Sequence, residues 1–170
     1  RIGAGNAVDI AGRLDGYFAH AVIKILMPEK LKNLEKSLRV IGMGRMIDQF
    51  VLSMNRAAEA AAPQAREIFV AAIREITFAD VKQLLSANET AVTTFFRDKT
   101  TERLTAAFAP VVQKTMAENQ VGRNFQNLVN AARKVPFLKL EAVDIDAYVV
   151  GKSLDGLFFL VGEEEKKIRK

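Results

Sequence analysis

Apolar residues recur along most of this chain at intervals of three and four positions, the spacing of one face of an α-helix. In the first clear example, Leu31, Leu34, Leu38 and Ile41 follow Pro28 and precede Gly42-Met43-Gly44. Proline suits a first helical turn and glycine a C-terminal cap, so we expect a helix between them. Later helices are predicted by similar stripes: Ile47, Phe50, Val51, Met54, Ala58 and Ala61; then Ala65, Ile68, Phe69, Ala72, Ile73 and Ile76; then Leu104, Phe108, Val111 and Val112; then Val121, Phe125, Leu128, Val129 and Ala132.

Capping residues indicate where several of these helices begin. Thr77 and Asp80 have the spacing of a capping box, in which each residue's side chain accepts from the other's main-chain amide. Asn88 can cap the next helix, and Thr100 or Thr101 is expected to begin another.

The few non-helical stretches offer no partner strands for a sheet. Ala21 to Met27 looks extended, Pro136 to Val143 looks like a loop, and Asp144 or Asp146 can cap the last helix. The sequence therefore predicts an all-α fold. We expect one domain over residues 1–170, built as an irregular helical bundle of about eight or nine helices.

Composition narrows the classes of function. With 49% hydrophobic and 26% charged residues the chain is typical of globular proteins, and no stretch reaches the ~20 apolar residues of a membrane span. The net charge of +5 would suit nucleic acid, but acidic residues interrupt nearly every basic stretch. We therefore expect solvated helix faces and no nucleic-acid partner.

Metal and cofactor chemistry finds little support. The chain has no cysteine and a single histidine, His20, so neither a disulfide nor a zinc site is expected. Gly42-Met43-Gly44 is a poor phosphate loop, and no nucleophile stands beside an evident base. We expect His20 to be a surface or capping residue, and we predict no metal, no cofactor and no catalytic residue.

A polar group interrupts the alanine-rich stretch before Pro63. Asn55 and Glu59, with Asp48, follow one flank of the apolar stripe, and Arg56 lies beside Glu59. These side chains could grip a ligand or partner, or they could form a structural network, which we favour because buried polar groups need partners. We expect Asn55 to bind main-chain groups of the Ile23–Pro28 segment.

The last helix is apolar on two opposite sides, which is typical of a central helix. Val150, Leu154, Leu157, Val161 and Ile168 face one way, while Tyr148, Lys152, Asp155 and Phe159 face the other. We therefore expect Asp155 to be mostly buried and paired with Arg56 or Arg97, since an unpaired buried carboxylate is costly. A catalytic role for Asp155 is the alternative.

The end of the chain is strongly charged. Residues 163–170 contain three acids, four bases and a single apolar residue, Ile168. We expect a solvated helix end that inserts into no membrane, because this run has little net charge and no apolar face.

Several short motifs, in this order, resemble a bacterial family catalogued as domain of unknown function 4197. They are Ile23-Lys24-Ile25 before a proline, Asn55-Arg56-Ala57-Ala58-Glu59 with Ala62-Pro63, Phe78-Ala79-Asp80, Phe96-Arg97 with Lys99-Thr100, Asp146 with Tyr148, Ser153-Leu154-Asp155-Gly156-Leu157-Phe158, and Glu163-Glu164-Glu165-Lys166-Lys167-Ile168-Arg169. One departure is Ile25-Leu26-Met27-Pro28, where the family usually reads Ile-Pro-Leu-Pro.

The resemblance implies an all-helical fold and an exported, periplasmic or envelope-associated protein, since similar chains commonly begin with a signal peptide or lipoprotein signal. It implies no activity. Because this chain begins at Arg1 rather than Met, we expect a processed or trimmed product. Similar chains continue after the charged run with a short tail that this chain lacks, which suggests C-terminal trimming or disorder.

Three classes of function remain open. We favour a non-enzymatic envelope protein that acts as a partner-binding or assembly module. A carrier of an apolar small molecule between helices is the alternative, with Phe95-Phe96 and Phe158-Phe159 as possible lining. A hydrolase using Asp or Glu carboxylates is the third. The candidate binding or structural residues are Asn55, Arg56, Glu59, Arg97, Tyr148 and Asp155.

Overall fold

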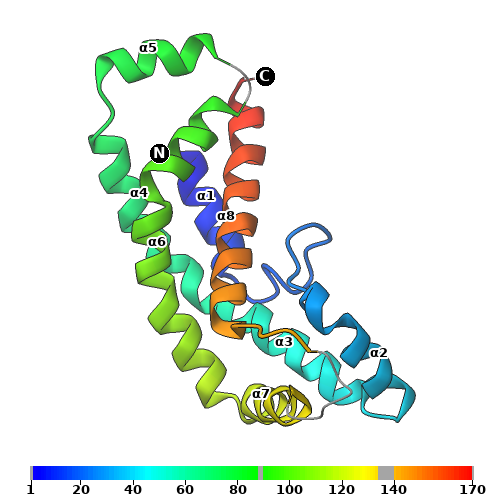
Figure 1. Ribbon diagram of the computed structural model, residues 1–170. Helices are drawn as coiled ribbons and strands as arrows, with labels where there is room; N and C mark the ends of the chain where they lie inside the picture. Colours follow the sequence, from blue (N-terminus) through cyan, green and yellow to red (C-terminus); the bar gives the residue numbers. More distant parts are fainter. Residues whose placement is uncertain (1, 88–89, 134–139, 170) are drawn as a thin grey trace.

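The computed structural model describes residues 2–87, 90–133 and 140–169, most of which are helical (Figure 1). The helices are α1 (Ile2–Gly12), α2 (Lys32–Val40), α3 (Gly44–Ala61), α4 (Ala65–Arg74), α5 (Phe78–Ser86), α6 (Ala91–Glu118), α7 (Gln120–Arg133) and α8 (Ile145–Arg169). There are two single turns of 3-10 helix: η1 (Glu29–Leu31) precedes α2, and η2 (Ala62–Gln64) follows α3. No strand occurs in these residues, so the all-α prediction is confirmed.

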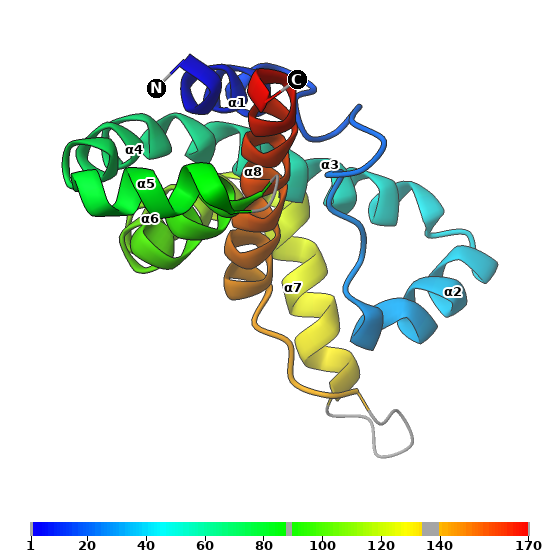
Figure 2. The ribbon, with the colours of Figure 1, turned by 90° about the horizontal axis from the view of Figure 1, so that it is seen from above.

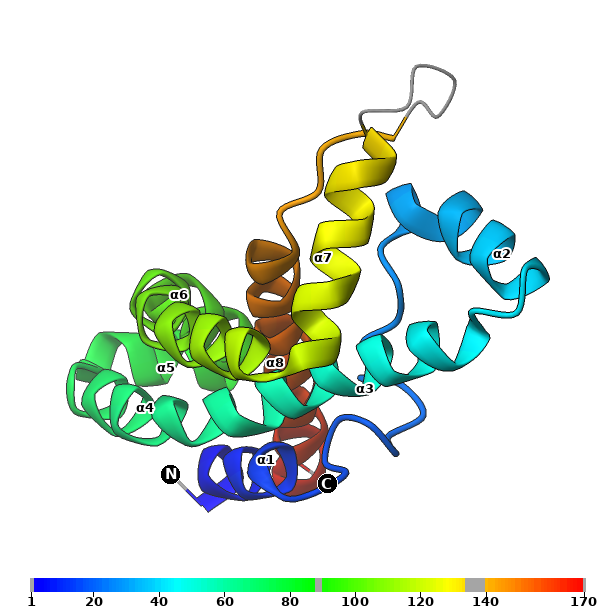
Figure 3. The ribbon, with the colours of Figure 1, turned by 90° about the horizontal axis from the view of Figure 1, so that it is seen from below.

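The long helix α8 occupies the middle of the bundle. It packs against α1, α3 and α6, and α3 also contacts α2, α6 and α7. Seen from above, α4, α5 and α6 lie to one side of α8, while α2 extends on the other side (Figure 2). From below, α2 and α7 point away from the rest of the bundle (Figure 3). The largest fully buried side chains are Tyr17, Phe50, Phe69, Phe108, Phe125 and Phe158.

Local signals explain several helix ends. Gly42 has φ of +86°, the left-handed conformation of a glycine cap, as the sequence predicts. Thr77 and Asp80 form the expected capping box. Asp144 caps α8, because its Oδ1 accepts from the Ala147 amide at 3.0 Å. The predicted Asn88 cap and residues 136–139 of the predicted loop lie outside the described residues.

The predicted helix start at Thr100 or Thr101 is wrong, since α6 runs through both residues. Each threonine hydroxyl donates to the carbonyl four residues earlier, Thr100 to Phe96 at 2.5 Å and Thr101 to Arg97 at 2.6 Å. A threonine satisfied in this way fits inside a helix, so its residue type alone does not mark a boundary.

The solvated end predicted for α8 is wrong for two of its acids. Glu164 and Glu165 are each only 7% exposed. Glu165 accepts from the amides of Val92 and Thr93, at 3.0 and 2.8 Å, and from the Thr93 hydroxyl at 2.7 Å. The first amides of α6 have no partner within their own helix, and this carboxylate from α8 satisfies them.

Glu164, the other buried acid of α8, contacts the first helix. The side-chain amide of Asn6 in α1 donates to its carboxylate at 2.9 Å. Ile168, which shares a face of α8 with Val150 and Leu154 by spacing, is 72% exposed, as expected of the solvated end. Within the described ranges, no helix combines the length and the apolar character that crossing a membrane requires.

Candidate functional site

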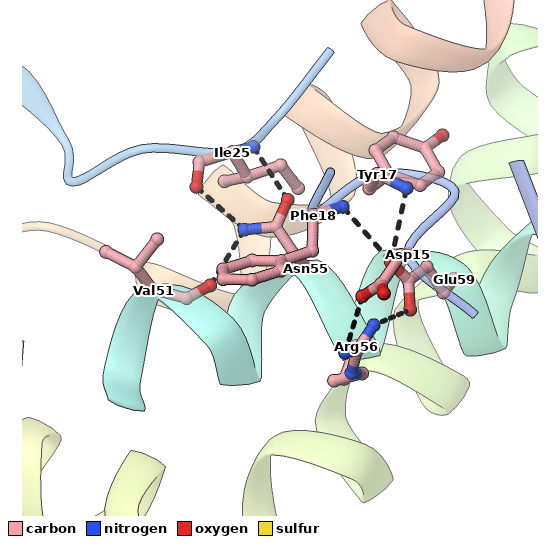
Figure 4. A network of polar contacts seen from close by, with 8 residues as sticks. All are labelled: Asp15, Tyr17, Phe18, Ile25, Val51, Asn55, Arg56 and Glu59. Carbon is pink, nitrogen blue, oxygen red and sulfur yellow. Dashed lines mark hydrogen bonds and ion pairs between the residues drawn. The ribbon is translucent and has the colours of Figure 1, made fainter. Parts of the chain in front are cut away.

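Asn55 fastens an extended part of the chain to α3. Its Oδ1 accepts from the Ile25 amide at 2.8 Å, and its Nδ2 donates to the Ile25 and Val51 carbonyls, both at 2.8 Å (Figure 4). The Asn55 side chain is fully buried. The prediction that Asn55 binds main-chain groups of the 23–28 segment is therefore confirmed.

Glu59, one helical turn further along α3, holds the turn that leads into this segment. Its Oε1 accepts from the Tyr17 and Phe18 amides, both at 3.1 Å. Arg56 donates to Glu59 Oε2 at 2.6 Å and to Asp15 Oδ1 at 2.7 Å, and so links the helix to the turn (Figure 4). Asp15 has φ of +64°, a conformation that non-glycine residues rarely adopt, and Arg56 binds its side chain there.

The electrostatics of this cluster follow from its contacts. Burial by itself lowers the pKa of Arg56, but hydrogen bonds to Glu59 and Asp15 outweigh burial, and the pKa lies above its usual value. Asp48, expected on the same flank as Asn55 and Glu59, instead pairs with Arg39 at 2.8 Å on the surface. The structural-network interpretation of Asn55, Arg56 and Glu59 accounts for every hydrogen bond described for their side chains.

Residues 22–27, which we call the docked segment, have alternating exposure. The expected extended stretch Ala21 to Met27 is wrong for residues 21–23, which form a turn closed by the Lys24 amide and the His20 carbonyl. Ile23, Ile25 and Met27 are 6%, 1% and 4% exposed, whereas Val22 and Leu26 are 63% and 59% exposed. His20 starts the segment by accepting from the Val22 and Ile23 amides through Nδ1, at 3.1 and 3.4 Å. The capping role expected of the single histidine fits this geometry.

The first half of α8 lies close to the docked segment and to the preceding turn. A Cβ atom on Gly156 would lie 2.6 Å from Tyr17 Cε1 and 3.0 Å from Ile23 Cβ, so this approach requires glycine. Tyr17 donates its hydroxyl to the Ser153 carbonyl at 2.5 Å, and burial raises its pKa, with smaller contributions from Glu59 and Asp155.

Tyr148 makes the second tie between α8 and the docked segment. Its hydroxyl donates to the Leu26 carbonyl at 2.7 Å. Burial raises the pKa of this hydroxyl, and the charge of Glu29 adds to the effect. Tyr148 therefore positions the segment from the side opposite to Asn55.

Between these contacts, the docked segment and α8 line a groove of about 880 Å³ that is open to solvent. One wall is formed by residues 22–30 and the other by residues of α8 that include Tyr148, Lys152, Asp155 and Phe159. The groove therefore has a rigid frame, because buried hydrogen bonds fix the docked segment and Gly156 packs against it.

Asp155 lies in the α8 wall, and its predicted burial is wrong. Its side chain is 60% exposed, because the docked segment covers this side of α8 only in part. The predicted cationic partner is confirmed as Arg97, whose Nη1 lies 3.1 Å from Asp155 Oδ1. Arg56, the other candidate, instead binds Asp15 and Glu59. The Arg97 guanidinium also lies 4.7 Å from the centre of the Phe158 ring.

The six predicted residues thus fall into two groups that face the docked segment from opposite sides. Asn55 holds the docked segment from α3, and Arg56 and Glu59 hold the turn that precedes it, whereas Tyr148 and Asp155 lie across the groove on α8, with Arg97 beside Asp155. Sequence reasoning did not assign to the site five further residues that complete it: Tyr17, Lys24, Leu26, Lys152 and Gly156. The alternation of apolar residues at 23, 25 and 27 was the available signal.

The chemistry that this arrangement offers is hydrogen bonding, ion pairing and apolar contact. No group of three or more His, Asp or Glu in the described ranges could together hold a metal ion. The groove presents two exposed apolar side chains, Val22 and Leu26, next to lysines and carboxylates. Such a lining is suited to binding.

Fold and site together define a helical domain that holds one extended segment against two of its helices. The chain matches, over residues 1–170, the family described as "Protein of unknown function (DUF4197)", and it belongs to that family. The resemblance seen in the sequence motifs is therefore confirmed. Neither the curated proteins nor the solved structures gave a match to this chain.

Proposed function

We propose that this protein is a non-enzymatic, exported module of the bacterial envelope, and that its groove binds a protein partner. The observation that carries the proposal is the display of Val22 and Leu26, at 63% and 59% exposure, on a segment fixed by buried hydrogen bonds. Fixed apolar side chains at the edge of a groove are typical of interaction sites, because a partner that covers them removes apolar surface from water.

The mixed lining supports a protein partner over an apolar small molecule. Lys24 and Lys152 line the same groove as Leu26 and Phe159, and an apolar ligand would remove these two charges from water without pairing them. A protein segment carries both polar and apolar groups. For a hydrolase, the groove offers Asp155, which Arg97 already binds. Export is supported by the signal sequences common in the family.

The test is site-specific photo-crosslinking in the native envelope. A photoreactive phenylalanine analogue replaces Leu26 in the groove or, as a matched control, Val40, an 86% exposed residue of α2 that does not line the groove. We expect a discrete protein adduct from position 26 and none from position 40. An adduct with lipid or a small molecule would support the carrier instead, and equal labelling from both positions would reject the groove as a binding site.

A further inference from the structure

The docked segment has the side-chain pattern of a single β-strand. Ile23, Ile25 and Met27 point into the bundle, while Val22 and Leu26 point outward, and this period of two is typical of a half-buried strand. The described chain contains no strand with which residues 22–27 could pair. The main-chain groups of this segment must therefore find other partners.

One edge of the segment is satisfied by Asn55. This side chain accepts from the amide and donates to the carbonyl of the same residue, Ile25. A residue in a neighbouring antiparallel strand makes the same pair of hydrogen bonds. Asn55 therefore takes the place of a neighbouring strand along the α3 side.

The other edge faces the groove and is only partly satisfied. In extended backbone, successive residues direct their amides and carbonyls to opposite sides, so those of Lys24 and Leu26 point away from Asn55. The Leu26 carbonyl accepts from Tyr148 of α8, and the Lys24 amide donates to the His20 carbonyl at 3.3 Å. The hydrogen bonds within the described ranges leave the Lys24 carbonyl and the Leu26 amide without a partner.

The charges around this edge favour an anionic occupant. Most charged groups of the groove already have partners: Glu29 pairs with Lys32, Lys30 with Glu141 and Asp155 with Arg97. The remaining carboxylate, Asp144, caps α8 by accepting from the Ala147 amide. Lys24 and Lys152 contact aromatic rings instead, at 4.2 Å from the centre of Phe18 and 6.0 Å from that of Tyr148. Neither lysine has a carboxylate partner in the described part of the chain, so both can bind one.

We propose that the groove binds an extended acidic segment of another protein as an added β-strand along the Lys24–Leu26 edge. The inference rests on the proposed partner-binding function and names the chemistry of the partner. The partner's main chain accepts from the Leu26 amide and donates to the Lys24 carbonyl, which is the hydrogen bonding of strand addition. Its acidic side chains pair with Lys24 and Lys152, and its apolar ones cover Val22 and Leu26.

The experiment measures amide hydrogen exchange by NMR with a nine-residue peptide of alternating valine and glutamate, blocked at both ends. Strand addition is expected to slow exchange of the Leu26 amide about tenfold or more at saturation, because that amide gains an acceptor. The Ile25 amide is the internal control, since it already donates to Asn55. A bound peptide that leaves the Leu26 amide unprotected would overturn strand addition.

Two matched comparisons separate main-chain pairing from charge attraction. The same peptide, N-methylated at alternate residues, keeps its charges but loses main-chain donors. Its affinity for the groove is expected to be about tenfold lower. Replacing both lysines, Lys24→Gln and Lys152→Gln, should weaken binding about three- to tenfold at low salt. Lys36→Gln removes the same type of charge from α2, outside the groove, and should change affinity less than twofold.

The outcomes distinguish this inference from the proposed function. If the peptide fails to bind, or if a lysine-containing peptide of the same pattern binds equally well, the acidic-strand inference is rejected. Crosslinking of an envelope protein through position 26 would still support the partner-binding function. If the Leu26 amide is protected and the N-methylated peptide binds weakly, the acidic-strand inference and the partner-binding function are both supported.

Discussion

Replacing Asn55 with alanine tests the hydrogen bonds that hold the docked segment. The variant leaves the amide and the carbonyl of Ile25 buried without partners, whereas the Val51 carbonyl keeps its helical hydrogen bond. An unsatisfied buried donor or acceptor costs about 1–3 kcal/mol, so the two groups should lower the free energy of unfolding by about 2–6 kcal/mol. A loss of this size is a large part of the roughly 5–15 kcal/mol of stability that folded domains have.

Urea unfolding followed by circular dichroism measures this loss, with Asn124→Ala as the control. Asn124 is exposed on α7, so its replacement should change stability by no more than about 0.5 kcal/mol. Hydrogen exchange at the Ile25 amide shows whether the segment itself is released. An Asn55→Ala protein that is as stable as the Asn124→Ala control, with Ile25 still protected, would refute the role assigned to this side chain.

Three further predictions concern packing, helix capping and pH. Gly156→Ala should lower stability by about 1–3 kcal/mol in thermal or urea unfolding, because the new methyl group meets the Tyr17 ring, whereas Gly151→Ala has open space and should not destabilise. Glu165→Gln should cost about 1–2 kcal/mol, since a charged acceptor of the first α6 amides becomes neutral, and calorimetry should show a lower Tm. Hydrogen bonds from Lys167 and Asn6 lower the pKa of Glu164, so its contribution to stability is present at neutral pH and is lost as pH falls through the lowered pKa. The stability difference between wild type and Glu164→Gln should therefore be larger at pH 7 than at pH 3, and an equal difference at both would contradict this.

The sequence predicted hydrogen-bond partners and helix ends correctly where a residue's type allowed only one kind of environment. Asn55 interrupts an apolar stripe, and a buried amide needs both a donor and an acceptor, so its pairing with a nearby extended segment could be predicted. Gly42 and the Thr77–Asp80 box act within a single turn, and local rules are sufficient for them. The helical fold followed from apolar spacing in the same way.

The errors arose where the outcome depended on distant parts of the chain. Asp155 has apolar neighbours on its helix, but its exposure depends on how much of α8 the docked segment covers, which apolar periodicity does not encode. Glu165 belongs to a charged run that looks solvated, yet it is buried because α6 begins beside it. The groove itself combines two segments more than a hundred positions apart, as the Tyr148 to Leu26 hydrogen bond shows.

The contacts between the two ends of the described chain have a consequence for synthesis. Asn6 binds Glu164, and Tyr17 binds the Ser153 carbonyl, across sequence separations of 158 and 136 residues. A nascent chain cannot close these contacts, nor complete the packing around α8, until α8 has emerged from the ribosome. Contacts between residues so far apart in sequence close more slowly than those within one helix, because a longer loop must be ordered first. The polypeptide therefore stays incompletely folded until α8 has been synthesised, and a chain that stops before α8 lacks the central helix on which the bundle is built.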